Sequence, residues 1–248
     1  ADQAKSRRRG LDVNGDGKNE VVTLPNAELH IPYVTQGYAF FVVEGAYGDG
    51  SRAARRLAGF ENLLLSDQPA VRAAGDYYPP DGVPAPTTVH IVGDPRPEII
   101  APVNDGFIYA VSADNKRLWR YNYSGGKPKV FASEVTVADL NKDGKPELLF
   151  GVYSLNPGGG RLVILANTGE LLSDTPLPGQ SMNGNGIGVP AAPTVADVDG
   201  DGTLEVLVST LDHGVDIFNI PGSGTKCALW PDARGNLLRN SMGPNTAK

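Results

Sequence analysis

Three acidic segments of the sequence have the residue types and the spacing of calcium-binding loops. Residues 12–20, 139–147 and 197–205 carry Asp or Asn at the first, third and fifth positions, Gly at the sixth and Glu at the ninth. Carboxylate and amide oxygens are the ligands that Ca²⁺ prefers, and a glycine after the fifth position permits the sharp turn that wraps a chain around an ion. The pattern therefore predicts about three bound calcium ions.

In each loop we expect side-chain oxygens from the first, third, fifth and ninth positions and a backbone carbonyl from the seventh. The predicted ligands are Asp12, Asn14, Asp16, Lys18 and Glu20 in the first loop, Asp139, Asn141, Asp143, Lys145 and Glu147 in the second, and Asp197, Asp199, Asp201, Thr203 and Glu205 in the third. No catalytic residue and no organic cofactor is predicted.

Other interpretations of these loops fit less well. An EF-hand needs a Glu at position 12 and a following helix, whereas position 12 is Thr23, Phe150 or Val208. Magnesium favours rigid octahedral sites that retain several waters. Strings of Asp, Asn and Gly also form ordinary turns without an ion, but ten carboxylates gathered in three loops would repel one another without a cation. Calcium is therefore favoured.

Each loop lies within a repeat of β-favouring segments. The runs 21–24, 148–151 and 206–209 follow the three loops, and the runs 134–138 and 192–196 precede the last two. A fourth copy at residues 85–100 keeps both runs but lacks the acidic loop, with Glu98 at the place of Glu147 and Glu205. With the alternating runs that follow, each repeat of about 50 residues predicts four antiparallel strands.

Four short strands cannot bury their own hydrophobic faces, so an all-β, β-propeller-like array of about four four-stranded blades is expected. The blades fall at about 10–50, 85–125, 130–178 and 190–240, with an insertion at 46–84. Within the insertion, Ser51 is a suitable N-cap and Ala54, Leu57, Ala58 and Leu64 share one helical face, which predicts a short helix from 51 to about 65. A long surface loop is the alternative.

The three loops, the lead-in Ala-Pro-Thr-Val-Ala-Asp at 192–197 and the motif Leu-Trp-Pro at 229–231 before Gly235 and Asn236 resemble FG-GAP and VCBS repeats of bacterial integrin-like proteins. The resemblance implies one domain over 1–248, built from calcium-binding propeller blades. Propellers of this family commonly have seven blades, whereas four repeats are found here. Either four blades close, with residues 230–240 pairing near 9–11, or the chain belongs to a larger propeller or assembles with copies of itself through edge strands.

Composition excludes several classes of protein. The 248-residue chain has one cysteine, Cys227, which rules out a disulfide scaffold and a four-cysteine zinc site. Its net charge of −6 argues against a general nucleic-acid binder, and no apolar run approaches the ~20 residues of a membrane span. The histidines His30, His90 and His213 lie in different repeats without a metal or hydrolase motif.

Loops of this kind match extracellular calcium concentrations, so an extracellular or cell-surface location is expected. The sequence begins at Ala1 without an initiator Met, as after removal of a signal peptide or without one. We expect a calcium-binding module for adhesion, for binding a protein or glycan ligand, or for structural self-assembly. The alternative is a carbohydrate-active enzyme of the lyase or dehydratase type, because some propellers of this family have that activity.

Overall fold

The computed structural model describes residues 12–17, 20–23, 38–39, 41–43, 57–59, 64–66, 84–127, 129–154, 159–179 and 186–230. Within these ranges the regular structure is almost entirely β, with a single three-residue 3-10 helix, η3 (Thr225–Cys227). The all-β prediction is confirmed. No helix in the described part of the chain is long and apolar enough to cross a membrane.

The N-terminal part contributes two small sheets. Strand β1 (Val21–Thr23) pairs with β3 (Phe41–Val43), and β2 (Tyr38–Ala39) pairs with β4 (Leu64–Ser66). The prediction of a helix reaching Leu65 is wrong at its C-terminal end, because Leu64–Ser66 is a strand held by long-range pairing, which outweighs local helix preference. Residues 51–56 of that predicted helix lie outside the described residues.

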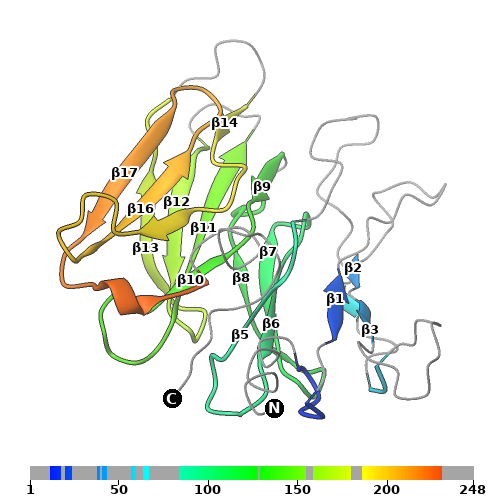
Figure 1. Ribbon diagram of the computed structural model, residues 1–248. Helices are drawn as coiled ribbons and strands as arrows, with labels where there is room; N and C mark the ends of the chain where they lie inside the picture. Colours follow the sequence, from blue (N-terminus) through cyan, green and yellow to red (C-terminus); the bar gives the residue numbers. More distant parts are fainter. Residues whose placement is uncertain are drawn as a thin grey trace.

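Two later repeats form the predicted four-stranded meander, in which each strand pairs antiparallel with the next (Figure 1). The first of these sheets consists of β5 (Thr87–Val89), β6 (Glu98–Pro102), β7 (Phe107–Val111) and β8 (Arg117–Asn122). The second has the order β10 (Thr136–Ala138), β11 (Glu147–Ser154), β12 (Arg161–Leu165) and β13 (Leu171–Pro176).

Short strands extend the second meander, and the last repeat is smaller. Strands β9 (Val130–Ala132) and β14 (Ile187–Gly188) pair with the end of β11, and β18 (Ala228–Trp230) pairs with β10. In the last repeat, β15 (Thr194–Ala196), β16 (Leu204–Ser209) and β17 (Val215–Ile220) form a three-stranded sheet. The strand pattern within a repeat is therefore strand, nine-residue loop, strand, hairpin, strand.

The hydrophobic cores lie between successive sheets, because strand residues alternate between the two faces. On β6, Ile100 packs toward the β10–β13 sheet, whereas Ile99 and Ala101 pack toward Val13 and Val42 of the N-terminal part. On β11, Phe150 faces the β5–β8 sheet and Leu149 faces the last sheet. Sheets buried on both faces in this way are the blades of the propeller-like array.

Buried threonines also join neighbouring sheets at their first strands. Thr87 Oγ1 donates a hydrogen bond to the Val135 carbonyl (2.8 Å), and Thr136 Oγ1 donates to the Pro193 carbonyl (2.5 Å). In both cases the acceptor directly precedes the threonine that opens the first strand of the next sheet. The same junction thus occurs twice, and in Figure 1 the sheets follow one another side by side in chain order.

Of residues 230–240, which would pair near 9–11 if four blades closed, the structure describes only Trp230. Trp230 pairs with Val137 of β10, while residues 231–240 and 9–11 lie outside the described residues. The domain and blade boundaries stay predictions.

Candidate metal centres in the acidic loops

The three acidic loops adopt one conformation that is fixed by backbone hydrogen bonds to their own carboxylates. The first-position Asp accepts the sixth-position N–H in every loop: Gly17 to Asp12 (2.6 Å), Gly144 to Asp139 (3.0 Å) and Gly202 to Asp197 (3.1 Å). The fifth-position N–H donates to the third-position side chain over 2.9–3.1 Å in each loop. The acidic side chains are therefore turned inward, toward the middle of the loop.

Glycine permits this turn because the fourth and sixth positions have positive φ angles. Gly15 and Gly17 have φ of 81° and 85°, and Gly200 and Gly202 have 79° and 88°. The middle loop has Gly144 at the sixth position but Lys142, with φ of 63°, at the fourth. The sixth-position glycine of the pattern is thus required by the backbone conformation, since it has a positive φ in all three loops.

The ninth-position glutamates tie the end of each loop to its beginning. Glu20, Glu147 and Glu205 are each at most 5% exposed, and each Oε2 accepts the N–H of the second loop residue, over 2.6, 2.6 and 2.9 Å. Their position at the start of a strand places them under the loop. The second oxygen, Oε1, of Glu205 is buried without a hydrogen-bond partner.

Two of the loops bring their carboxylates close enough to share an ion. One oxygen each of Asp12, Asp16 and Glu20 lie within 4.8 Å of one another, and so do oxygens of Asp197, Asp199 and Glu205. The donors are all oxygen atoms, which suits a hard divalent cation. This donor set, made up of carboxylate oxygens, fits calcium.

Burial and repulsion from neighbouring carboxylates favour protonation of Glu20 and Glu147, or binding of a cation beside them. Burial raises the pKa of Glu20 to about 7, with further increases from Asp12 and Asp16, against the lowering effect of the Val13 and Asn14 backbone hydrogen bonds. Burial likewise raises the pKa of Glu147, which faces Asp143 and Asp139. A positive ion between the carboxylates would offset the same repulsion.

The remaining predicted ligands are placed as follows. In the middle loop Asp139, Asn141, Asp143 and Glu147 repeat the hydrogen bonds of the other loops, but their carboxylate oxygens do not converge within the same distance. In the last loop, the Thr203 hydroxyl and N–H both donate to Asp201, which lowers the pKa of that carboxyl. Lys18 lies outside the described residues, and carbonyl ligation by Lys145 and Thr203 stays a prediction.

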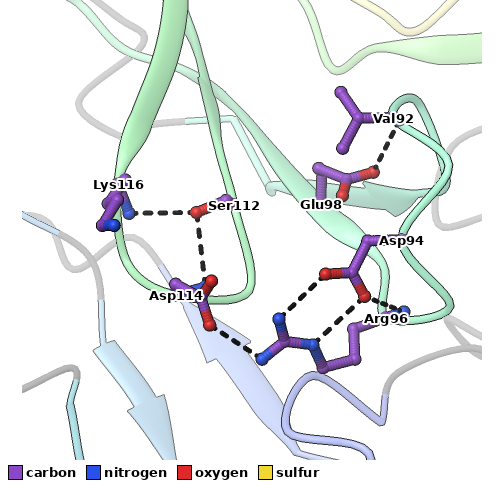
Figure 2. A network of polar contacts seen from close by, with 7 residues as sticks. All are labelled: Val92, Asp94, Arg96, Glu98, Ser112, Asp114 and Lys116. Carbon is purple, nitrogen blue, oxygen red and sulfur yellow. Dashed lines mark hydrogen bonds and ion pairs between the residues drawn. The ribbon is translucent and has the colours of Figure 1, made fainter.

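The fourth copy of the loop carries its own positive charge. Here the fifth position is Asp94 and the seventh is Arg96, whose Nη2 lies 2.8 Å from Asp94 Oδ2 and whose Nη1 lies 2.9 Å from Asp114 Oδ1 in the β7–β8 turn (Figure 2). The hydrogen bonds from Arg96 lower the pKa of Asp94 to about 2. In this blade a guanidinium neutralises the carboxylates that an ion would neutralise elsewhere.

The fourth loop also shows that the ninth-position Glu has a structural role without an ion. Glu98 is 1% exposed, and its Oε2 accepts the N–H of Ile91 (2.7 Å). The same oxygen accepts the N–H of Val92 (3.3 Å), as Figure 2 shows. Sequence reasoning missed Arg96 and Asp114. The signal was a loop of unchanged length, from His90 to Glu98, with an arginine two residues after its only internal carboxylate.

Arg96 also connects this blade to the first acidic loop. Its Cγ and Cδ lie 3.6 and 3.7 Å from the position that a Cβ on Gly15 would occupy. The first acidic loop therefore packs against the arginine side chain of the next blade.

One further group of titratable side chains lies outside the loops, in the β16–β17 turn. His213 Nε2 is 2.9 Å from Asp216 Oδ2, and His213 Nδ1 is 3.5 Å from Asp212 Oδ1. Both Asp212 carboxylate oxygens are buried without a hydrogen bond. The sequence motifs did not indicate this row of carboxylate, imidazole and carboxylate.

The repeated blades, each with a nine-residue loop closed by a buried Glu, define a β-blade repeat protein in which most of these loops are acidic. Residues 139–208, from the first residue of the middle loop into β16, match the family model of the FG-GAP-like repeat. This segment is therefore an FG-GAP-like repeat, the resemblance that the sequence motifs predicted.

Among solved structures, the chain is similar to the V. cholerae biofilm matrix protein Bap1, at 21% sequence identity and a TM-score of 0.35. The similarity covers 61% of this chain and 31% of Bap1, so this chain matches less than a third of that protein. A comparison with curated proteins found no match.

Proposed function

We propose that the protein is an extracellular or surface-located module for adhesion or matrix building, in which Ca²⁺ in the acidic loops stabilises the blades. The observation that carries the proposal is the convergence of three carboxylates in each of two loops, on a buried glutamate that ties the loop to a strand. An ion there links both ends of the loop, and so connects the two strands that the loop joins.

The proposed location follows from the affinity expected of such a site. Loops of this type in extracellular modules have a Kd of about 10⁻⁴–10⁻³ M. At about 1 mM Ca²⁺ each site would then stabilise the folded chain by about 0.4–1.4 kcal/mol, and at submicromolar Ca²⁺ by almost nothing. Sites of this affinity would therefore be occupied outside the cell, where Ca²⁺ is millimolar.

Calorimetric titration of Ca²⁺ into metal-free protein tests the metal sites. We expect about three sites, and weak competition by Mg²⁺ because the larger ion accepts irregular oxygen ligands. Glu205→Gln should remove one site, whereas the exposed Glu170→Gln, on the β12–β13 turn, should remove none. Absence of binding at millimolar Ca²⁺ would refute the metal assignment.

The adhesion role is tested separately, by binding of fluorescently labelled protein to cells, glycan arrays and immobilised copies of itself. We expect binding in Ca²⁺ that falls after chelation, with Glu205→Gln weaker than Glu170→Gln. A protein that takes up calcium but binds none of these surfaces would contradict adhesion and leave the metal sites standing. Turnover in a parallel screen of acidic and neutral polysaccharides would favour the enzyme alternative.

A further inference from the structure

The last sheet ends at its third strand, unlike the two sheets before it. Strand β7 pairs with β8 and β12 pairs with β13, but β17 pairs only with β16 among the described residues. After β17 the chain turns at residues 221–224, passes through η3 and pairs as β18 with β10. The segment that directly follows β17 thus pairs with another sheet, and β17 lies at the margin of the described structure (Figure 1).

The hydrogen-bond pattern shows which backbone groups of β17 face away from the sheet. The Thr210 N–H donates to the Gly214 carbonyl (2.7 Å), which marks the pair at the base of the β16–β17 turn as hydrogen-bonded. Hydrogen-bonded and non-bonded pairs alternate along an antiparallel ladder. The N–H and C=O groups of Val215, Ile217 and Asn219 therefore point away from β16, toward the open edge.

The side chains of the same residues are exposed as well. Val215 is 59% and Ile217 57% exposed, although the corresponding third strands β7 and β12 are largely buried. Phe218 and Ile220, on the other face of β17, pack against the core shared with the β10–β13 sheet. Exposed apolar side chains and a backbone edge that no described strand pairs with thus occur on one strand.

This edge lacks the features that protect edge strands from pairing, such as charged residues, proline and bulges. The outer strand β8 has Arg117, Arg120 and a register shift against β7, and β13 has Pro176 and a shift against β12. Strand β17 has six regular pairs with β16, no proline and no basic residue, and Asp216, its only charged side chain, contacts His213.

We propose that β17 of one molecule pairs antiparallel with β17 of a second copy, which joins two three-stranded sheets into one. A two-fold axis gives the antiparallel direction directly. Pairing centred on Ile217 sets Ile217 opposite its own copy, Val215 opposite Asn219, and Asp216 opposite Phe218, so no like charges face each other. This deepens the proposed adhesion or matrix role by naming one partner.

A single strand pair buries less surface than the roughly 1,600 Å² of a standard stable interface. The dimer is therefore weak, and it forms at the high local concentrations of a surface layer or matrix. Sedimentation velocity across a wide concentration range, in Ca²⁺, measures it. We expect a reversible monomer–dimer equilibrium.

Three variants test the contact. Ile217→Pro removes an outward N–H that β16 does not use, and Ile217→Lys adds charge while keeping the backbone; each should weaken the dimer by about tenfold or more. Leu172→Lys, at an equally exposed leucine (53%) of β13, is the matched control and should leave the dimer unchanged. Retained calcium-dependent melting shows that each variant is folded and that the calcium sites are independent of this contact.

Covalent capture gives a second measurement. In a Cys227→Ser background, Ile217→Cys should form an intermolecular disulfide, because directly opposed residues of such a pair have Cα atoms about 5.5 Å apart. Leu172→Cys should not. A protein that stays monomeric at all concentrations, a dimer unaffected by both Ile217 variants, or a monomer whose Ile217 N–H is already protected from hydrogen exchange would overturn the proposal.

Discussion

The raised pKa of Glu20 predicts that the metal-free protein loses stability as the pH rises from about 5 to about 8. In the folded, ion-free chain this pKa is about 7, whereas the usual value is 4.5. Between these two values the unfolded chain is ionised and the folded chain holds the proton. The stability is therefore fully present below the lower value and is lost as the pH passes through the higher one.

The size of the effect follows from the shift. One pKa unit corresponds to about 1.4 kcal/mol, so Glu20 alone costs the metal-free protein about 3 kcal/mol at pH 8. For a chain of this length that corresponds to a decrease in Tm of roughly 10 °C. Glu147, whose pKa is also raised, adds to the loss. Bound Ca²⁺ stabilises the ionised glutamates, so millimolar Ca²⁺ should recover part of this loss, up to about 1.4 kcal/mol for each occupied site.

Differential scanning calorimetry of protein made metal-free by gel filtration measures the effect without the pH-dependent affinity of a chelator. Glu20→Gln should reduce the slope of Tm against pH in metal-free protein, and the exposed Glu170→Gln should not. Asp94 does not interfere, since its pKa of about 2 lies below this range. A Tm of metal-free protein that rises with pH, or a slope unchanged by Glu20→Gln, would refute the reasoning.

Three further variants test the contacts between and within blades. Thr136→Val leaves the buried Pro193 carbonyl without a partner and should cost about 1–3 kcal/mol in denaturant unfolding, whereas Thr168→Val, at an exposed turn, should cost almost nothing. Gly169→Ala should cost more than Gly222→Ala in the same measurement: both glycines have positive φ, but only at Gly169 would the new Cβ lie 2.7 Å from the Trp119 ring. Arg96→Met should lower Tm slightly and by the same amount with and without calcium, because its charge neutralises Asp94 and Asp114 without an ion; a loss seen only in Ca²⁺ would contradict this role.

The acidic loops and the blades could be predicted because their information is local. The hydrogen bonds of each loop join residues of the same nine-residue segment. Asp139 accepts the N–H of Gly144, five residues later, and Glu147 accepts that of Leu140. The strands on either side have alternating or continuous apolar residues, a pattern that can be recognised from the local sequence alone. Three copies of such a pattern give the same prediction three times.

Features that depend on distant residues could not be predicted. The helix predicted in the insertion is wrong at its C-terminal end for this reason, since Leu64–Ser66 continues a helical pattern in the sequence but pairs as a strand with Tyr38–Ala39. The route of residues 221–230 is similar: its sequence is compatible with a fourth strand on β17, yet Trp230 pairs with Val137. The contact of Arg96 with Asp114 joins a loop to a turn two strands later, which no spacing rule indicates.

The threonine junctions have a consequence for how such proteins change over evolutionary time. Because Thr87 and Thr136 reach the same kind of carbonyl in the sheet that follows, the donor of one unit already fits the acceptor of any other. Gene duplication could insert a unit, or recombination remove one, without new side chains at the seam. Proteins built from such units should then differ in the number of units more readily than in the residues that join them.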